Sequence, residues 1–553
     1  MPLGGGPLSP CGNRLARNRS SLYKVLYSGK YLLHNVFMDA PFQAVLLDLP
    51  EQPDHSKPQP KGTPKLKTVN RLQTVLANIY VEELIAPDHK ARAIWQLVGA
   101  MDLSRFCDTV RTAVGCAGRA AWDPRLLVSV WIYAYSEGIG SAREIERIME
   151  WEPGLQWLSG MAAVNHHTLS DFRVEHKQAL DELFAELLAM LESAGVVSLE
   201  QVMHDGTKIR ALAGADSFRR EKTLRERLKE ARALVALMGD PREDEPAKDR
   251  KQAARERAQR ERLERLEAAQ KEMSELQAEK KSEEEKAAVR VSLPEPEARL
   301  MKHGDNAIAP SYNAQISTEG KNKIIVGAHL SQCSSDARSL MPALEEVAKN
   351  LGNKPAQVVV DGGFTNRENI IGCAAQQIDL VGSLADPKER SAAAMKSMGI
   401  AEEFAPYRFR ILDNGERLEC PAGCLLEPLR KSQKRGDLYQ QYRARGADCA
   451  VCQHQKKCCP RSGDKGRTVS IRLEEQADVA AFRKKMETEE YRAVYRKRGE
   501  VAEFPNAWIK EKLGLRKFRV RGKVKAGSEL LWACLTYNIM QWVRLIWRKP
   551  AMA

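Results

Sequence analysis

Apolar residues recur at helical spacing through the first third of the chain. Between about residues 69 and 198, they stand three and four positions apart in segments such as RLLVSVWIYAYSEG, AREIERIMEW and ALDELFAELLAMLESAG, which is the pattern of one helix face. Asp123-Pro124 and Ser141 are typical of helix starts, and Gly195 of a stop. We expect an all-helical domain of about five to seven helices. Its helix–turn–helix rhythm is typical of DNA-binding modules, although plain helical packing predicts the same rhythm.

After residue 198 the pattern alternates between short apolar strands and helices. The strand-like segments are QVMHDG, SYNAQIST, KIIVGAHLSQ, AQVVVDGG and DLVGSL, and helical segments such as ARSLMPALEEVAKNLG separate them. This order predicts a mixed α/β sheet with helices on both faces. We assign the sheet domain to residues 199–216, 300–400 and 470–548, where the apolar helix SELLWACLTYNIMQWVRLI closes it.

Two insertions and an irregular start complete the organisation. Residues 217–299 are highly charged and carry a periodic apolar stripe at Leu228, Ala231, Val235 and Met238, which predicts a helical hairpin with solvated outer faces. Residues 401–469 form a cysteine-rich insertion. Residues 1–68 lack core-forming periodicity and end in a Pro/Lys-rich stretch, so we expect an irregular segment and linker there.

The cysteine-rich insertion has the spacing of a zinc-binding subdomain. Asp413-Asn414-Gly415 predicts a hairpin turn, whose second strand leads to Cys420 and Cys424, while Cys449 and Cys452 form a C-x-x-C pair. Four such thiols can hold a structural Zn²⁺ in tetrahedral geometry, giving a fold similar to a zinc ribbon. Cys458, Cys459 and His454 are substitute ligands, and unliganded thiols are the alternative.

Charge narrows the class of partner. The chain has 87 Lys and Arg against 73 Asp and Glu, a net charge of +14. Eleven Lys or Arg and three Asp or Glu fall between Arg496 and Lys525, so the excess is concentrated in one patch. Such a patch favours nucleic acid as the partner, with an acidic membrane surface second. No apolar run reaches the ~18 residues of a membrane span, and the start lacks a signal-peptide pattern, so we expect a cytoplasmic protein.

Two aspartates share a local design. Asp205 and Asp361 each follow an apolar, strand-like stretch and precede a glycine. An Asp-Gly pair is a common strand exit, but two strand-end aspartates and a helical glutamate also provide the oxygen ligands that Mg²⁺ prefers. Two such ions can activate an attacking hydroxyl and stabilise the leaving oxygen of a phosphodiester.

Three blocks of sequence resemble the D-D-E transposases of bacterial insertion sequences, which have the ribonuclease-H-like fold of the retroviral-integrase superfamily. The blocks are HDGTKIRA, VVVDGGFTN and YRAVYRKRGEVAEFPNAWIK, and WDPRLLVSVWIYAYSEGIGSAREIE is similar to the amino-terminal domain of these enzymes. The resemblance extends from about residue 70 to 545. It implies a DNA transposase that cleaves transposon ends and transfers a strand into target DNA, acting as a homodimer on terminal inverted repeats in the bacterial nucleoid.

The resemblance also assigns residues. It implies that Mg²⁺ or Mn²⁺ is held by a catalytic triad of Asp205, Asp361 and Glu503. It implies that DNA is contacted by Lys208, Tyr495, Arg498 and Lys510. Relatives place Pro directly after the catalytic Glu, whereas here Phe504 intervenes. Glu500 is therefore a competing ligand. We favour Glu503 because Arg496, Glu503 and Lys510 fall at seven-residue spacing on one helical face, although Pro505 can kink that helix.

Two other functions share these features. A transposase-derived protein that has lost catalysis would keep the helices and the basic patch for DNA binding alone, but it has no need of an intact acidic triad. A ribonuclease-H-like nuclease without strand transfer would keep the same triad. The sequence leaves the second alternative open.

Overall fold

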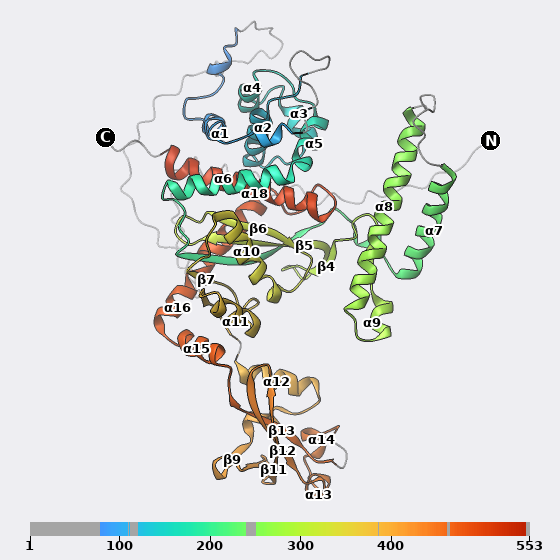
Figure 1. Ribbon diagram of the computed structural model, residues 1–553, viewed down its shortest axis with the longest axis vertical. Coiled ribbons are helices and arrows are strands. Elements are labelled where there is room, and N and C mark those ends of the chain that lie inside the picture. Colours follow the sequence, from blue (N-terminus) through green and yellow to red (C-terminus); the bar gives the residue numbers. More distant parts are fainter. Residues whose placement is uncertain are drawn as a thin grey trace, which may run out of the picture. The chain divides into compact units, whose positions relative to one another are not determined.

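The computed structural model describes residues 78–108, 110, 120–238, 250–384, 386–461 and 465–548 (Figure 1). All of these residues fall in one compact unit of the chain. The irregular segment expected over residues 1–68 lies outside the described residues. None of the helices in the described part is long and apolar enough to cross a membrane.

The amino-terminal region is helical, as its apolar spacing predicts. Asp123 and Ser141 cap their helices by accepting hydrogen bonds from the N–H groups of Arg125 and Glu144. Gly195 adopts a positive φ of 69° just after the last of these helices. The helices are α1 (Lys90–Val98), α2 (Pro124–Ser136), α3 (Ala142–Ile148), α4 (Pro153–Ser159), α5 (His166–Glu175) and α6 (Lys177–Ser193).

A mixed sheet forms the centre of the unit. Its strands are β1 (Gln201–Arg210), β4 (Arg299–Lys302), β5 (Ile308–Glu319), β6 (Ile325–Ser331), β7 (Gln357–Val359) and β8 (Asp379–Val381). They follow the order β4-β5-β1-β7-β8, and β6 also pairs with β5. Strand β1 is antiparallel to β5 and parallel to β7. This mixed sheet, with α10 (Leu340–Leu351) and α11 (Arg367–Ala375) in its crossovers, is consistent with a ribonuclease-H-like fold.

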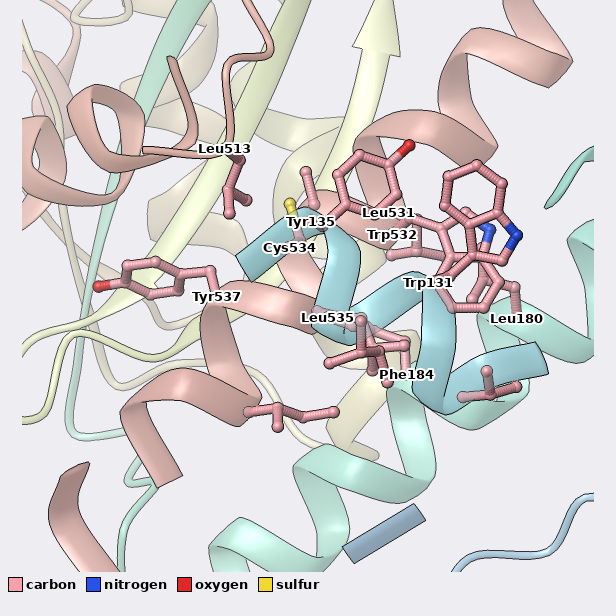
Figure 2. Close-up of a cluster of buried hydrophobic side chains, with 14 of the residues drawn as sticks. Trp131, Tyr135, Leu180, Phe184, Leu513, Leu531, Trp532, Cys534, Leu535 and Tyr537 are labelled. Atoms are coloured by element: carbon pink, nitrogen blue, oxygen red, sulfur yellow. The ribbon is translucent and has the colours of Figure 1, made fainter. Parts of the chain in front are cut away.

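Helix α18 (Lys523–Trp542) lies between the sheet and the amino-terminal helices. It contacts α2, α6 and β6, and Figure 2 shows its Trp532 and Leu535 packed with Trp131 and Phe184. The Asn538 side chain bonds the backbone N–H and C=O of Ile325 in β6. The helix that was expected to cap the sheet therefore also joins the sheet and the helical region into one hydrophobic core.

The charged segment after β1 forms a helical pair. Helices α7 (Glu221–Met238) and α8 (Arg250–Ala278) contact each other, and short strands β2 (Phe218–Arg219) and β3 (Val291–Ser292) pair at their base. Leu228 and Ala231 of the expected stripe are buried in a small separate core. Helix α9 (Glu283–Ala288) follows α8.

The cysteine-rich region contains a second, antiparallel sheet. Its order is β13-β12-β11-β10-β9, with β9 (Arg410–Leu412), β10 (Arg417–Glu419), β11 (Leu425–Lys434), β12 (Asp437–Ala444) and β13 (Thr468–Glu474). The predicted hairpin turn is present, because Leu412 pairs with Arg417 across Asp413–Gly415. The same region contains the helices α12 (Pro387–Ser397), α13 (Gly446–Ala450) and α14 (Gln455–Cys458). Strand β13 carries this sheet past residue 469, to Glu474.

The segment after β13 is helical but interrupted. It consists of α15 (Ala477–Met486), α16 (Glu489–Arg496), a π-helical turn η9 (Gly499–Glu503) and α17 (Phe504–Glu511), and a second π-turn, η10 (Val543–Trp547), follows α18. Turn η9 contacts β1 and β5. A π-turn is wider than an α-turn and is frequent at functional sites.

Candidate active site

The register of two parallel strands brings Asp205 and Asp361 together. Strands β1 and β7 pair from Gln201↔Gln357 to Met203↔Val359, so Asp205 and Asp361 each stand two residues beyond the last pair. Adjacent strands are about 4.8 Å apart, and the charge of Asp361 contributes to raising the pKa of Asp205. The structure thus places the two predicted aspartates side by side at one edge of the β1–β7 pairing.

The expectation that Asp205 ends its strand is wrong. Strand β1 continues to Arg210 and keeps its antiparallel pairing with β5 throughout. Only the pairing with β7 ends before Asp205, because β7 stops at Val359 and the chain turns into the Asp361 loop. Asp205 therefore lies within a strand that is paired with β5 on one side, and on its other side the pairing with β7 has already ended.

Asp361 is fixed by its own turn. Its Oδ1 accepts hydrogen bonds from the N–H groups of Gly363 (2.7 Å) and Phe364 (3.3 Å). The Thr365 hydroxyl donates to the Asp361 carbonyl at 2.8 Å. The Phe364 ring is buried and packs edge-on against His204 of β1, so the turn is anchored to the neighbouring strand.

Asp205 is held on the face of β1 that meets η9 and α17. Asn506 Nδ2 donates to its Oδ2 at 2.9 Å, and Arg498 Nη1 lies 4.0 Å from Oδ1. Burial, with a contribution from Asp361, raises the pKa of Asp205 to about 6, although Arg498 and Asn506 act in the opposite direction. A carboxylate kept in an environment that disfavours its charge is a mark of a functional site.

Arg498 lies between two of the predicted carboxylates. Its Nη2 is 3.9 Å from Glu503 Oε1, while its Nη1 faces Asp205. Glu503 ends the π-turn and is 68% exposed, whereas Arg498 is 19% exposed. The guanidinium of Arg498 therefore links Glu503 to Asp205.

The remaining basic residues are distributed over different faces. Lys510 donates to Thr207 Oγ1, on the same face of β1 as Asp205, and burial lowers its pKa. Lys208 lies on the opposite face and donates to the Lys302 carbonyl at 2.8 Å. Arg496 pairs with Glu489 and ends α16, whereas Lys510 lies in α17, beyond the π-turn. The single helical face expected from the seven-residue spacing is therefore interrupted.

Tyr495 lines a groove that contains both arginines and acidic residues. The arginines of this groove include Arg492 and Arg496. Tyr495 also packs against the cluster that contains Met203 and Val359. Tyr495 thus packs close to the strand ends that precede Asp205 and Asp361, and it also borders this groove.

Asn506 is the site residue that the sequence analysis did not identify. It is 7% exposed, and its Oδ1 has no hydrogen-bond partner in the described part of the chain. A signal was present, since Asn506 stands three residues after Glu503 and four before Lys510, a spacing that places helical residues on one face.

The donor atoms at this site are of the type that a divalent metal such as Mg²⁺ binds. Asp205, Asp361, Glu503 and the unpaired Asn506 oxygen are all oxygen donors, which Mg²⁺ prefers. Across the described ranges, however, no three His, Cys, Asp or Glu side chains are arranged to hold a metal ion. In this arrangement Arg498 lies within about 4 Å of both Asp205 and Glu503.

The cysteines of the second sheet gather around one small cavity. Cys420, Cys424, Cys449 and Cys452 line it together with the possible substitutes Cys458 and Cys459. All six are free thiols, and burial raises the pKa of Cys458 to about 12. Their present arrangement is likewise not that of a formed metal site, so the zinc assignment stays a prediction.

Two transposase family models match the chain. Residues 79–175 match the transposase domain DUF772, and residues 419–543 match a transposase DDE domain. The second match contains the block with Arg498 and Glu503, whereas Asp205 and Asp361 lie outside both matches. These matches confirm the resemblance to insertion-sequence DDE transposases. No curated protein matches the chain.

Proposed function

We propose that the chain is a DNA transposase that cleaves transposon ends and transfers the freed 3′ hydroxyl into target DNA. The observation that carries this proposal is the register of β1 and β7, which brings Asp205 beside Asp361 where η9 packs on β1 and Asn506 of α17 bonds to Asp205. The transposase family matches support the class of reaction. The partners are the terminal inverted repeats and target DNA, bound by two copies of the chain in the bacterial nucleoid.

Asp205, Asp361 and Glu503 would hold the divalent metal, Mg²⁺ or Mn²⁺. A bound metal supplies an activated hydroxyl and stabilises the leaving oxygen of the phosphodiester. The protein's contribution is to fix Asp205 within a paired strand and Asp361 in a hydrogen-bonded turn. Glu503, on the exposed end of the π-turn, completes the set when Arg498 moves away.

Arg498 and Lys510 bring positive charge to the acidic face of β1. In our proposal the phosphate backbone takes the place of the carboxylates as the partner of Arg498. Tyr495 and the arginines of its groove extend the DNA surface, where an aromatic ring can stack on an unpaired base. Lys208 contacts backbone farther from the cleaved bond. Such phosphate contacts weaken as salt rises.

Labelled terminal-repeat DNA tests this function. The substrate is DNA that carries the inverted repeats expected to flank the reading frame, and Mg²⁺ and a target plasmid complete the reaction. Cleavage with joined product supports the transposase. Cleavage without joined product would replace it by a ribonuclease-H-like nuclease. Binding without cleavage would replace it by a DNA-binding protein that has lost catalysis.

We also propose a structural Zn²⁺ in the second sheet, held by Cys420, Cys424, Cys449 and Cys452. The support is the convergence of these thiols on one cavity, reached from β10, the loop before β11 and the segment around α13. A metal there would link elements that otherwise share a core of only a few side chains.

A further inference from the structure

A chain of polar side chains crosses the sheet on the face opposite Asp205. His204 Nδ1 lies 2.9 Å from Ser317 Oγ, and His204 Nε2 lies 2.9 Å from Gln315 Oε1. Gln315 Nε2 in turn donates to Asp336 Oδ1 at 3.0 Å, and Asn313 Nδ2 donates to the same oxygen at 2.7 Å. This hydrogen-bond network therefore begins on β1 and β5 and ends at the carboxylate of Asp336.

Burying these polar side chains away from water costs folding free energy. Ser317, His204, Gln315 and Asn313 are each at most 2% exposed, and buried polar groups destabilise a fold unless they are hydrogen-bonded. Asn313 Oδ1 is left without a partner in the part of the chain that the structure describes. An apolar sheet face would avoid this cost, so the polar chain calls for a role beyond packing.

Asp336 lies close to a glycine beside each of the two site aspartates. A methyl group on Gly206, which follows Asp205, would lie 2.5 Å from Asp336 Oδ1 and 2.7 Å from Gln315 Nε2. A methyl group on Gly363, in the Asp361 turn, would lie 3.8 Å from Asp336 Cβ and 3.0 Å from Asp361 Oδ1. The carboxylate of Asp336 thus fills the space that glycine leaves beside Asp205, and the Cβ of Asp336 lies near the turn of Asp361.

The segment that carries Asp336 is tied to the same turn. The carbonyl of Ala337, the next residue, accepts hydrogen bonds from the side chains of Asn366 (2.6 Å) and Asn369 (3.0 Å). Asn366 caps α11 directly after the Asp361 turn. Movement of Asp336 would therefore displace both β1 at Gly206 and the start of α11.

We propose that Asp336 is a positioning residue of the acidic site, which keeps the Asp361 turn in register with Asp205. It acts through hydrogen bonds to Asn313 and Gln315 and through contact with Gly206, not by touching substrate. The inference rests on the proposed function for its effect on cleavage. It also explains the glycine after Asp205, because any larger residue there would collide with Asp336.

The first experiment compares Asp336→Ala with Asp336→Asn in the full chain. Asp336→Ala removes the acceptor of two buried amides, and we expect the cleavage rate at saturating DNA to fall about tenfold to a hundredfold, the range for groups that orient metal ligands. DNA affinity should not change. Asp336→Asn keeps an oxygen in place and should restore most of the rate. A dead Asp336→Asn would overturn the proposal, because the negative charge itself would then be required. Glu345→Ala, an exposed acid on α10, is the matched control.

A double substitution tests the contact with Gly206. Gly206→Ala should slow cleavage because the new methyl group meets Asp336 Oδ1. Adding Asp336→Ala should then cost less than it does in the wild type, since the shortest of the new contacts is removed while that with Gln315 Nε2 remains. Strictly multiplicative effects would show that the two positions are independent and would contradict the proposal.

Hydrogen exchange separates this inference from the proposed function, because it needs no catalysis. Asp336→Ala should speed exchange at the Gly363 and Phe364 amides, which bond to Asp361 Oδ1, while melting curves report whether the variant is folded. Glu345→Ala should leave these amides unchanged. Unaltered exchange at both amides in folded Asp336→Ala would overturn the proposal even if the wild type cleaves DNA.

Discussion

At the scale of single residues, the acidic site is built from groups that are costly to bury. Asp205 is held among Asp361, Asn506 and Arg498, and its pKa lies near 6 because burial disfavours its charge. A neighbouring cation, Arg498, offsets part of that cost in the metal-free protein. The negative charge of Asp205 therefore lowers the stability of the fold, whereas metal binding in our proposal requires it.

Asp205→Asn should raise the stability of metal-free protein above pH 6, by about 3 kcal/mol. The folded-state pKa of Asp205 is raised, so its ionisation destabilises the fold at high pH, and this loss is relieved as pH falls from about 6 towards 4 and the folded state takes up a proton. Thermal unfolding at pH 8 and pH 4.5 measures the difference. Equal unfolding temperatures of variant and wild type at pH 8 would contradict the raised pKa.

The third carboxylate is tested by a matched pair of glutamines. Glu503→Gln should remove cleavage, because an amide keeps the shape but not the charge that holds Mg²⁺. Glu500→Gln, on the same π-turn, should leave cleavage near the wild-type rate. The opposite ranking in a strand-cleavage assay would transfer the role to Glu500.

At the scale of elements, apolar spacing was sufficient to locate most strands and helices. It could not show the register between β1 and β7 that brings Asp205 and Asp361 together. The pattern after Asp205 turns polar at Thr207 and Lys208, so the strand looked finished, but long-range pairing with β5 carries it to Arg210. The π-turn before Pro505 could not be foreseen either, since it depends on packing against β1 and β5. Asn506 and Arg498 acquire their positions from that turn.

The second sheet gives a prediction of its own. Protein purified without chelators should contain one zinc per chain, and a Cys449→Ser, Cys452→Ser double variant should lose it, because a tetrahedral site cannot form without these thiols. Metal analysis by mass spectrometry measures both. Cys107→Ser with Cys333→Ser, two exposed cysteines, is the control. Metal-free wild type in a folded state would show that the thiols are unliganded.

At the scale of the whole molecule, helix α18 makes the sheet and the amino-terminal helices one cooperative unit. Trp532 is fully buried and its Nε1 donates to the Arg173 carbonyl in α5. Neither the composition nor the helical spacing of this segment could show which partners its several apolar faces would take, because it is apolar on most sides.

Trp532→Ala should therefore destabilise the protein by about 3–5 kcal/mol through the cavity it leaves. Loss of helix and loss of sheet should shift together in a denaturant titration followed by circular dichroism. Trp151→Ala, at a position that is 59% exposed, should have little effect. Separate transitions for the helical region and the sheet would contradict a shared core.

The central claim is that Asp205 and Asp361 form one metal-dependent site for DNA cleavage, and Asp361→Asn tests it most directly. The variant keeps an oxygen for the Gly363 and Phe364 amides and leaves Arg498 and Lys510 in place. It should bind labelled terminal-repeat DNA as the wild type does and, with Mg²⁺, release no 3′ hydroxyl end. Cleavage by Asp361→Asn at the wild-type rate would contradict the account.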